Sequence, residues 1–270
     1  MTGNSLVSII IPTKNSEATI EKCLHSIRNQ TYPHIEIIIV DAFSKDKTKE
    51  IAENYRAQVF VIKAKRSEAR NIGAEKAKGE LIFFLDSDME IDSCVIEECT
   101  EKVREGYHAV IVPEVTFGQG FWARCRALEK LCAMNGDLLE GSRFFERAAF
   151  EVVNGYDPLL EASEDWDLHI RIKKNGFKIA RIKAYVKHND EQISLWNSMK
   201  KKYYYGKTIS KYMKKHPNIA KKQINPFRGV FRNWRLMVKD PIHASGLIVM
   251  KIFEFGAGGL GLIKDKTERK

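Results

Sequence analysis

Short runs of apolar residues alternate with amphipathic stretches through roughly the first 110 residues of the chain. Apolar runs bounded by polar turns are typical of strands that helices cover on both faces of a sheet. The pattern predicts strands at Leu6–Ile11, Ile35–Val40, Gln58–Ile62, Leu81–Leu85 and His108–Val112. We therefore expect an α/β fold, in which a mostly parallel sheet is flanked by helices.

Helices are expected in the gaps between these strands. Four polar residues stand where helical spacing begins, and each side-chain oxygen can accept a hydrogen bond from a free backbone N–H group. The predicted N-caps are Ser16, Asp46, Ser67 and Ser93.

The strict alternation of strands and helices ends after Pro113. The spacing then predicts a helix over Phe121–Met134 and another that begins near Glu164 and stops at Gly176. The short strands expected after it are Phe177–Ile182 and Tyr185–Lys187.

From Ser194 onward the sequence is helical, basic and aromatic, with breaks predicted at Pro217, Pro226 and Pro241. Residues 196–270 hold 18 Lys or Arg and four Asp or Glu, whereas residues 1–195 hold 27 and 31. The net charge of +10 therefore comes from the carboxyl-terminal part. We predict a domain over 1–190, with a nucleotide-binding half at about 1–113 and an acceptor half at about 114–190, and a basic, partly amphipathic helical extension over 191–270.

One segment of this extension, Ile242–Ile263, is apolar enough to suggest a membrane span. Lys251 and Glu254 fall at its centre, where ionised groups cost several kcal/mol in lipid, so an interfacial or core-packed helix is expected instead. The amino terminus lacks a basic region followed by a long apolar run, and the five cysteines form no CxxC pair. Both features favour the cytoplasm.

The basic residues of the extension are interleaved with aromatic ones, such as Tyr203 and Trp234. Such a segment can bind an anionic lipid surface or nucleic acid, and a merely solvated helical face is the third interpretation. We favour the membrane, because a nucleic-acid partner would not need the apolar side chains of Leu247, Ile248, Val249, Ile252, Phe253 and Phe255. A peripheral protein on the inner face of the cell membrane is expected, with no nucleic-acid partner.

Two aspartates, Asp86 and Asp88, follow the fourth predicted strand in the run FFLDSDME at 83–90. Alternate carboxylates at a strand end can converge on one hard divalent cation, and oxygen ligands suit Mn²⁺ or Mg²⁺. Such a cation would bridge a diphosphate and neutralise its charge as it leaves. The alternative is an acidic turn, since Asp is common where strands end.

A third aspartate, Asp41, stands at the carboxyl end of the second predicted strand. Nucleotides bind at this edge of open α/β sheets, where a carboxylate can accept hydrogen bonds from a base or ribose. Asp46, a few residues later, is better explained as a helix cap.

Four motifs in this order resemble those of glycosyltransferase family 2, inverting enzymes with the GT-A fold. They are VSIIIPTKN at 7–15, VDAFSKDKT at 40–48, EARNIGAEKAKGELIFFLDSD at 68–88 and EDWDLHIRIKKNGFKI at 164–179, and the resemblance spans roughly residues 5–190. It implies transfer of one sugar from a nucleotide-sugar donor, most often UDP- or GDP-linked, with Mn²⁺ or Mg²⁺ as cofactor.

The resemblance also implies roles for individual residues. Pro12, Thr13 and Asn15 would line the donor nucleotide, with Asp41 at its base. Arg70 would approach the diphosphate, Asp86 the ribose or sugar, and Asp88 the metal, whose shell would include Asp86 and His188. Asp165 would be the catalytic base, with Glu164 and Trp166 on the acceptor side.

Two departures from the family pattern matter. Many members have a second acidic residue directly after the one that matches Asp41, and this chain has Ala42 there. The QxxRW signature of processive polysaccharide synthases is missing, and FRNWR at 231–235 does not satisfy it. Single-sugar addition is therefore favoured, and the basic extension favours a lipid-linked sugar or polyprenyl phosphate as the acceptor.

Alternatives remain for the site and for the whole chain. Glu164, Asp165 and Asp167 can also favour a helix amino terminus through its dipole. The stretch IIIPTKNSEAT lacks the glycine-rich phosphate loop expected of a sugar nucleotidyltransferase. The rival from another class is a non-catalytic nucleotide-sugar-binding or membrane scaffold protein with the same fold.

Overall fold

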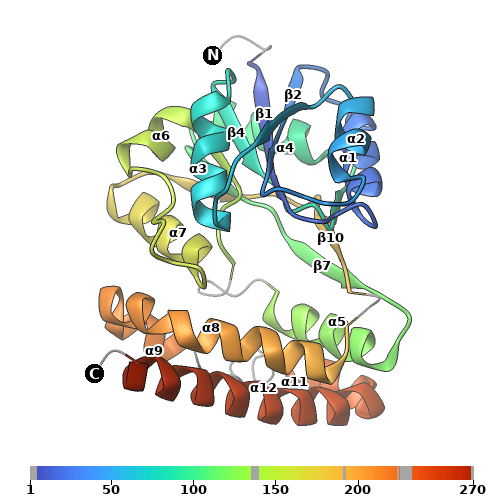
Figure 1. The fold of residues 1–270 in the computed structure, drawn as a ribbon, viewed down its shortest axis with the longest axis vertical. Helices are drawn as coiled ribbons and strands as arrows, with labels where there is room; N and C mark the ends of the chain where they lie inside the picture. The colour runs from blue at the N-terminus through green and yellow to red at the C-terminus, as the bar shows by residue number, and fades with distance from the viewer. Residues whose placement is uncertain (1–4, 135–139, 191–192, 224, 226–232, 269–270) are drawn as a thin grey trace. The chain divides into compact units, whose positions relative to one another are not determined.

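The computed structural model describes residues 5–134, 140–190, 193–223, 225 and 233–268 (Figure 1). The chain divides into two compact units. Unit 1 comprises Met1–Glu114, Gly141–Pro158 and Asp167–His188. Unit 2 comprises Val115–Glu140, Leu159–Trp166 and Asn189–Lys270.

A seven-stranded sheet forms the centre of unit 1, in the strand order β3-β2-β1-β4-β8-β6-β9. Strands β1 to β4 are mutually parallel, and β8 is antiparallel to both β4 and β6. The bounds are β1 Val7–Thr13, β2 Ile35–Asp41, β3 Gln58–Val61, β4 Leu81–Phe84, β6 Ala109–Ile111, β8 Phe144–Glu146 and β9 Ile179–Arg181. The predicted α/β fold with a mostly parallel sheet is confirmed.

The continuous apolar runs of the central strands place buried side chains on both faces of this sheet. In β1, Ile9 and Ile11 belong to one buried apolar cluster and Ile10 to another. Successive side chains of a strand point to opposite faces, so an unbroken apolar run needs a helical layer on each. The helices of unit 1 supply these layers: α1 Ile20–Arg28, α2 Thr48–Asn54, α3 Arg66–Lys76, α4 Val95–Arg104 and α6 Arg147–Val152, together with most of α7 Glu164–Lys174.

The predicted helix starts are displaced from the observed ones. The N-cap positions are Thr19, Lys47, Lys65 and Cys94, so the four predicted caps are wrong. Ser16 and Asp46 belong instead to turns that precede their helices. The Ser16 carbonyl accepts from the backbone of Thr19, and the Asp46 carboxylate accepts from the backbone N–H of Thr48 at 3.1 Å.

Two strands outside the seven-stranded sheet matter for the site. Strand β5 (Met89–Ile91) pairs antiparallel with β10 (Val186–Asn189), and His188 stands opposite Met89. Sequence pattern did not predict β5 or β8, because these three-residue strands do not lie within a longer run of apolar or alternating residues. A further short strand, β7, covers Glu114–Phe117.

Unit 2 is helical. Its helices are α5 Phe121–Ala133, α8 Leu195–Lys215, α9 Pro217–Gln223, α11 Trp234–Lys239 and α12 Pro241–Glu268. Pro217 and Pro241 begin helices, as their fixed φ allows, whereas the predicted break at Pro226 lies outside the described residues. Among the described helices, one is long and apolar enough to cross a membrane by length and composition, and it covers Pro241–Asp265.

Candidate active site at the strand ends of unit 1

Asp41 ends strand β2 beside Thr13, the last residue of β1. Its side chain is buried, and it accepts hydrogen bonds from the Thr13 hydroxyl at 3.0 Å and from the Ser44 backbone N–H at 2.9 Å. The Ser44 hydroxyl donates to the same carboxylate. Asp41 therefore fixes the loop after β2 against the end of β1.

Asn15, in the loop after β1, also binds the loop after β2. It has a positive φ of 51°, which Asn tolerates better than most residues. Its backbone N–H donates to the Ser44 hydroxyl at 2.7 Å, and its side-chain oxygen accepts from the Lys45 backbone at 2.9 Å. The structure thus brings the predicted nucleotide residues Thr13, Asn15 and Asp41 together with Pro12 at one edge of the sheet.

Asp86 follows β4 and pairs with two arginines. The Arg70 guanidinium on α3 donates to its carboxylate at 2.8 Å, and Arg143 lies 4.0 Å from the other oxygen. Arg70 is almost fully buried, with its guanidinium 5.0 Å from the centre of the Tyr156 ring. Burial alone would raise the pKa of Asp86, but the nearby arginine charges outweigh it and hold that pKa well below its usual range.

Asp88, two residues further on, faces β10 instead. Its carboxylate lies 3.1 Å from Nε2 of His188, and the two side chains are 44% and 15% exposed. The residues come from positions 100 apart in the sequence and meet because β5 and β10 are neighbours. This places a carboxylate and an imidazole at one exposed point beside the arginine-bound Asp86.

These donors fit a divalent cation that also binds a phosphate. A carboxylate oxygen and an imidazole nitrogen suit Mn²⁺, and two protein ligands leave coordination positions for phosphate oxygens. Across the part of the chain that the structure describes, no three His, Cys, Asp or Glu side chains gather closely enough to hold a metal by themselves. The site would therefore depend on its substrate for the remaining ligands.

The predicted acceptor residues are Glu164, Asp165 and Trp166, at the start of α7. They belong to unit 2, where Glu164 is buried and the Trp166 ring lies 6.1 Å from that of Tyr212. Asp167, one residue later, is fully buried and pairs with Arg171 at 2.7 Å, which is a structural role. The assignment of Asp165 as catalytic base stays a prediction.

Three residues of this edge were not found from the sequence. Arg143 also pairs with Glu114 at 2.6 Å, and it reaches Asp86 because β8 is inserted beside β4. Tyr156 supports Arg70, and Ser44 completes the Asp41 network. No local motif marks Arg143 or Tyr156. Ser44 lies inside the motif at 40–48, so its hydroxyl could have been predicted to bind the Asp41 carboxylate.

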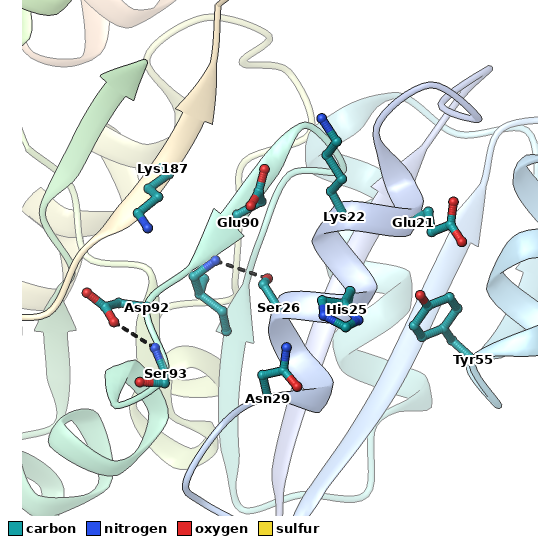
Figure 2. A pocket seen from close by; sticks show the side chains of 11 residues that line it. Glu21, Lys22, His25, Ser26, Asn29, Tyr55, Glu90, Asp92, Ser93 and Lys187 are labelled. Atoms are coloured by element: carbon teal, nitrogen blue, oxygen red, sulfur yellow. Dashed lines mark hydrogen bonds between the residues drawn. The ribbon is translucent and has the colours of Figure 1, made fainter. Parts of the chain in front are cut away.

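A cavity of about 450 Å³ lies elsewhere in unit 1, between α1 and β5 (Figure 2). Its lining mixes charges of both signs, including Lys22, Glu90 and Lys187, and the Ser26 hydroxyl there accepts from the Ile91 backbone at 3.0 Å. None of the predicted site residues is among the lining residues. The candidate site is therefore the open strand edge and not this cavity.

Known structures share the fold. *Pyrobaculum calidifontis* mannosyltransferase PcManGT, in complex with GDP-Man and Mn²⁺, has a TM-score of 0.66 at 14% identity, covering 100% of this chain and 89% of that one. *S. aureus* TarS 1-349, in complex with UDP-GlcNAc, has a TM-score of 0.60 at 16% identity, covering 97% and 92%. Both are similar in fold alone, and they confirm the GT-A architecture.

Sequence relatives match a shorter stretch. The *Campylobacter jejuni* GalNAc(5)-diNAcBac-PP-undecaprenol beta-1,3-glucosyltransferase is 35% identical over 109 residues, which is 37% of this chain and 35% of that protein. The chain thus spans about a third of the length of this relative. The sequence profile of glycosyl transferase family 2 matches residues 8–184, which include both loops, Asp86 and Asp88. The chain belongs to glycosyl transferase family 2.

Proposed function

We propose that this protein transfers a single sugar from a nucleotide-sugar donor to an acceptor, with inversion at the anomeric carbon and with the help of a divalent metal. The observation that carries the proposal is the meeting of Asp88 with His188 beside the arginine-bound Asp86. Family membership supports sugar transfer, and fold neighbours that hold UDP-GlcNAc or GDP-Man support a UDP- or GDP-sugar as donor.

The donor nucleotide would lie over the ends of β1 and β2. Pro12, Thr13, Asn15 and Asp41 would line it, and the hydrogen bonds between the two loops would keep that surface rigid before the donor arrives. A carboxylate can accept about four hydrogen bonds, so Asp41 retains capacity for a base or ribose donor. Rigid binding groups lose less entropy when a ligand binds.

Arg70 and Asp88 would act on the diphosphate. Asp88 and His188 would hold Mn²⁺ or Mg²⁺, with Asp86 beside them on Arg70, and the cation would supply positive charge against the departing diphosphate. Arg70 is already buried and oriented by Asp86 and Tyr156, so its charge is in place before the bond to the sugar breaks. Preorganised charge of this kind is the main source of stabilisation in such reactions.

Asp165 would act on the acceptor. Its carboxylate would remove the proton from an acceptor hydroxyl while that oxygen attacks the anomeric carbon, opposite the leaving nucleoside diphosphate. A positioned general base contributes about 10²–10⁴ in rate. Glu164 and Trp166 would flank the acceptor. With an acceptor that is already an ionised phosphate, Asp165 would only position it.

The acceptor is proposed to be a lipid-linked sugar or a polyprenyl phosphate, and the protein a peripheral one on the inner face of the cell membrane. The name of one relative, which acts on an undecaprenol-linked glycan, supports this class. The basic extension over 191–270 would meet such an acceptor at its headgroup.

The rival is a protein that keeps the fold and binds nucleotide sugars without turnover. A panel of UDP- and GDP-sugars with Mn²⁺ separates the two, with release of nucleoside diphosphate as the readout. We expect turnover by the parent chain and a loss of at least 100-fold in Asp88→Asn and in Asp165→Asn. Donor binding, measured as thermal stabilisation, should survive in Asp165→Asn. Binding without turnover of any donor by the parent chain would favour the rival.

A further inference from the structure

Helix α12 exposes an apolar face along most of its length. Eight apolar side chains of this helix are between 41% and 67% exposed, and they are called the outer face of α12 below. They are Ile242, Ile248, Val249, Ile252, Phe253, Phe255, Leu260 and Ile263. Water-soluble monomers rarely leave a contiguous apolar surface of this extent uncovered, so the outer face calls for a partner.

The opposite face of α12 is buried and holds both apolar and charged side chains. Leu247 and Met250 pack into an apolar cluster with α5, so the expectation that Leu247 belongs to the exposed apolar surface is wrong. Lys251 pairs with Glu129 on α5 and lies 3.3 Å from Glu254. Glu254 accepts from Arg126 on α5 and from the Ser198 hydroxyl on α8. The charged side chains of α12 are therefore buried and paired, while its exposed face is apolar, unlike that of a surface helix in a water-soluble protein. The partner of its outer face must be apolar.

The same buried contacts hold α12 to helices that cannot enter a bilayer core. α8 runs alongside α12, and the two backbones approach closely where Gly206 faces Gly258 and where Gly261 faces Tyr203. α8 carries seven lysines among its 21 residues, and α5 adds Arg126 to the shared ion cluster. If α12 crossed a membrane, these charges would enter lipid with it, at a prohibitive cost.

The exposed surface of unit 2 is basic. Among the described residues from α8 onward, the exposed cationic ones are Lys200, Lys201, Lys211, Lys214, Lys215, Lys221, Lys222, Arg235, Lys239 and Lys264. The acidic side chains Asp240, Glu254 and Asp265 each accept from a partner within the unit: His243, Arg126 and Ser210. This charge distribution is complementary to an anionic surface.

We propose that the outer face of α12 lies flat in the boundary between headgroups and acyl chains of an anionic bilayer, without crossing it. Trp234 and Val238 on α11 are also exposed and add apolar surface, and an indole ring suits the headgroup level. The inference rests on the proposed function, because a lipid-linked acceptor would present its sugar or phosphate at the headgroup level. Its physical basis, an exposed apolar helix face within a basic unit, is independent of catalysis.

Vesicle flotation of the full chain tests whether the outer face of α12 binds an anionic bilayer. Vesicles of phosphatidylcholine with roughly 30% phosphatidylglycerol should bind the parent chain, and binding should weaken with salt and on pure phosphatidylcholine. Phe253→Glu should need about tenfold more lipid for half-binding, because it removes an inserted ring and adds a negative charge. The control is Val152→Glu on α6 in unit 1, an apolar residue that is 60% exposed against 47% for Phe253, and this variant should bind as the parent does.

Protease access tests the orientation. With protein added outside sealed vesicles, a carboxyl-terminal tag should stay cleavable, and alkaline carbonate should release the protein. If the tag were protected from protease and alkaline carbonate did not release the protein, α12 would span the bilayer and the proposal would be overturned. Equal binding by Phe253→Glu and the parent chain would also overturn it. So would a stable dimer in solution that Phe253→Glu dissociates, since a second copy would then cover the outer face.

Failure of this inference can be told apart from failure of the proposed function. Asp88→Asn should float with vesicles as the parent does while losing sugar transfer. Phe253→Glu should keep metal-dependent hydrolysis of the donor in the absence of vesicles. If Phe253→Glu lost donor hydrolysis while its melting temperature was unchanged, the outer face would belong to the active part of the molecule and the membrane assignment would be wrong.

Discussion

The close approach of α8 and α12 predicts opposite effects for alanine at two helical glycines. At Gly206 an added Cβ would lie 2.1 Å from the carbonyl oxygen of Gly258, about 0.9 Å inside the 3.0 Å that side-chain carbons respect. At Gly256, on the exposed side of α12, an added Cβ would meet nothing within 4 Å. The same substitution therefore tests packing at one position and intrinsic helix propensity at the other.

The magnitudes follow from these two environments. Alanine at either site gains about 0.8–1.0 kcal/mol of helix propensity over glycine. At Gly206 the methyl must push two backbones apart, and overpacking of this kind costs about 1–3 kcal/mol. We expect Gly206→Ala to destabilise unit 2 by about 1 kcal/mol and Gly256→Ala to stabilise it by a similar amount.

Tryptophan fluorescence is a selective assay for this prediction. All four tryptophans, Trp122, Trp166, Trp196 and Trp234, belong to unit 2. A change of 1 kcal/mol shifts the melting temperature by roughly 2–4 °C in a protein of this size. Gly206→Ala should melt below the parent chain and Gly256→Ala above it. If both substitutions raised the melting temperature equally, the two helices would not approach as described and the reasoning would be refuted.

Three further predictions concern the metal and the buried ion cluster. Chelation of divalent cations should abolish sugar transfer, Mn²⁺ should restore it, and Asp88→Asn should lose the thermal stabilisation that Mn²⁺ and donor together give the parent chain. Burial alone would raise the pKa of Glu129, but the charges of Arg126 and Lys251 outweigh burial and hold that pKa well below its usual range. The ionised carboxylate therefore contributes stability above about pH 4.3, and this contribution is lost as the pH falls below that value. Acid unfolding curves of Glu129→Gln should lack this pH dependence. Burial lowers the pKa of Lys202 to about 8, so its protonated form disfavours the folded state and stability should rise between about pH 8 and 10.4. Lys202→Met should raise the melting temperature at pH 7, and an unchanged value there would contradict the burial argument.

The alternation of apolar runs and helical segments determined the core of unit 1. β1 to β4 fall where apolar runs stand between polar turns, since a strand buried on both faces needs an unbroken apolar run. The order of the motifs also determined the family. The positions of Thr13, Asn15 and Asp41 at one edge followed from parallel pairing, because parallel strands end on the same side of a sheet.

Tertiary structure alone decided the pairings that join distant segments. β8 lies antiparallel beside β4 and brings Arg143 to Asp86, and β10 beside β5 brings His188 to Asp88. β5 and β8 are three residues long, too short for a periodic pattern to mark them, and the strand expected at Tyr185–Lys187 carried no sign of the partner that β10 pairs with.

The burial of two charged side chains of α12 was likewise decided by packing. Lys251 and Glu254 appear in the sequence as interruptions of an apolar segment, and their burial depends on Arg126 and Glu129 more than 120 positions away. A sequence records which side chains are apolar or charged, whereas the contacts that satisfy a buried charge exist only once the chain has folded.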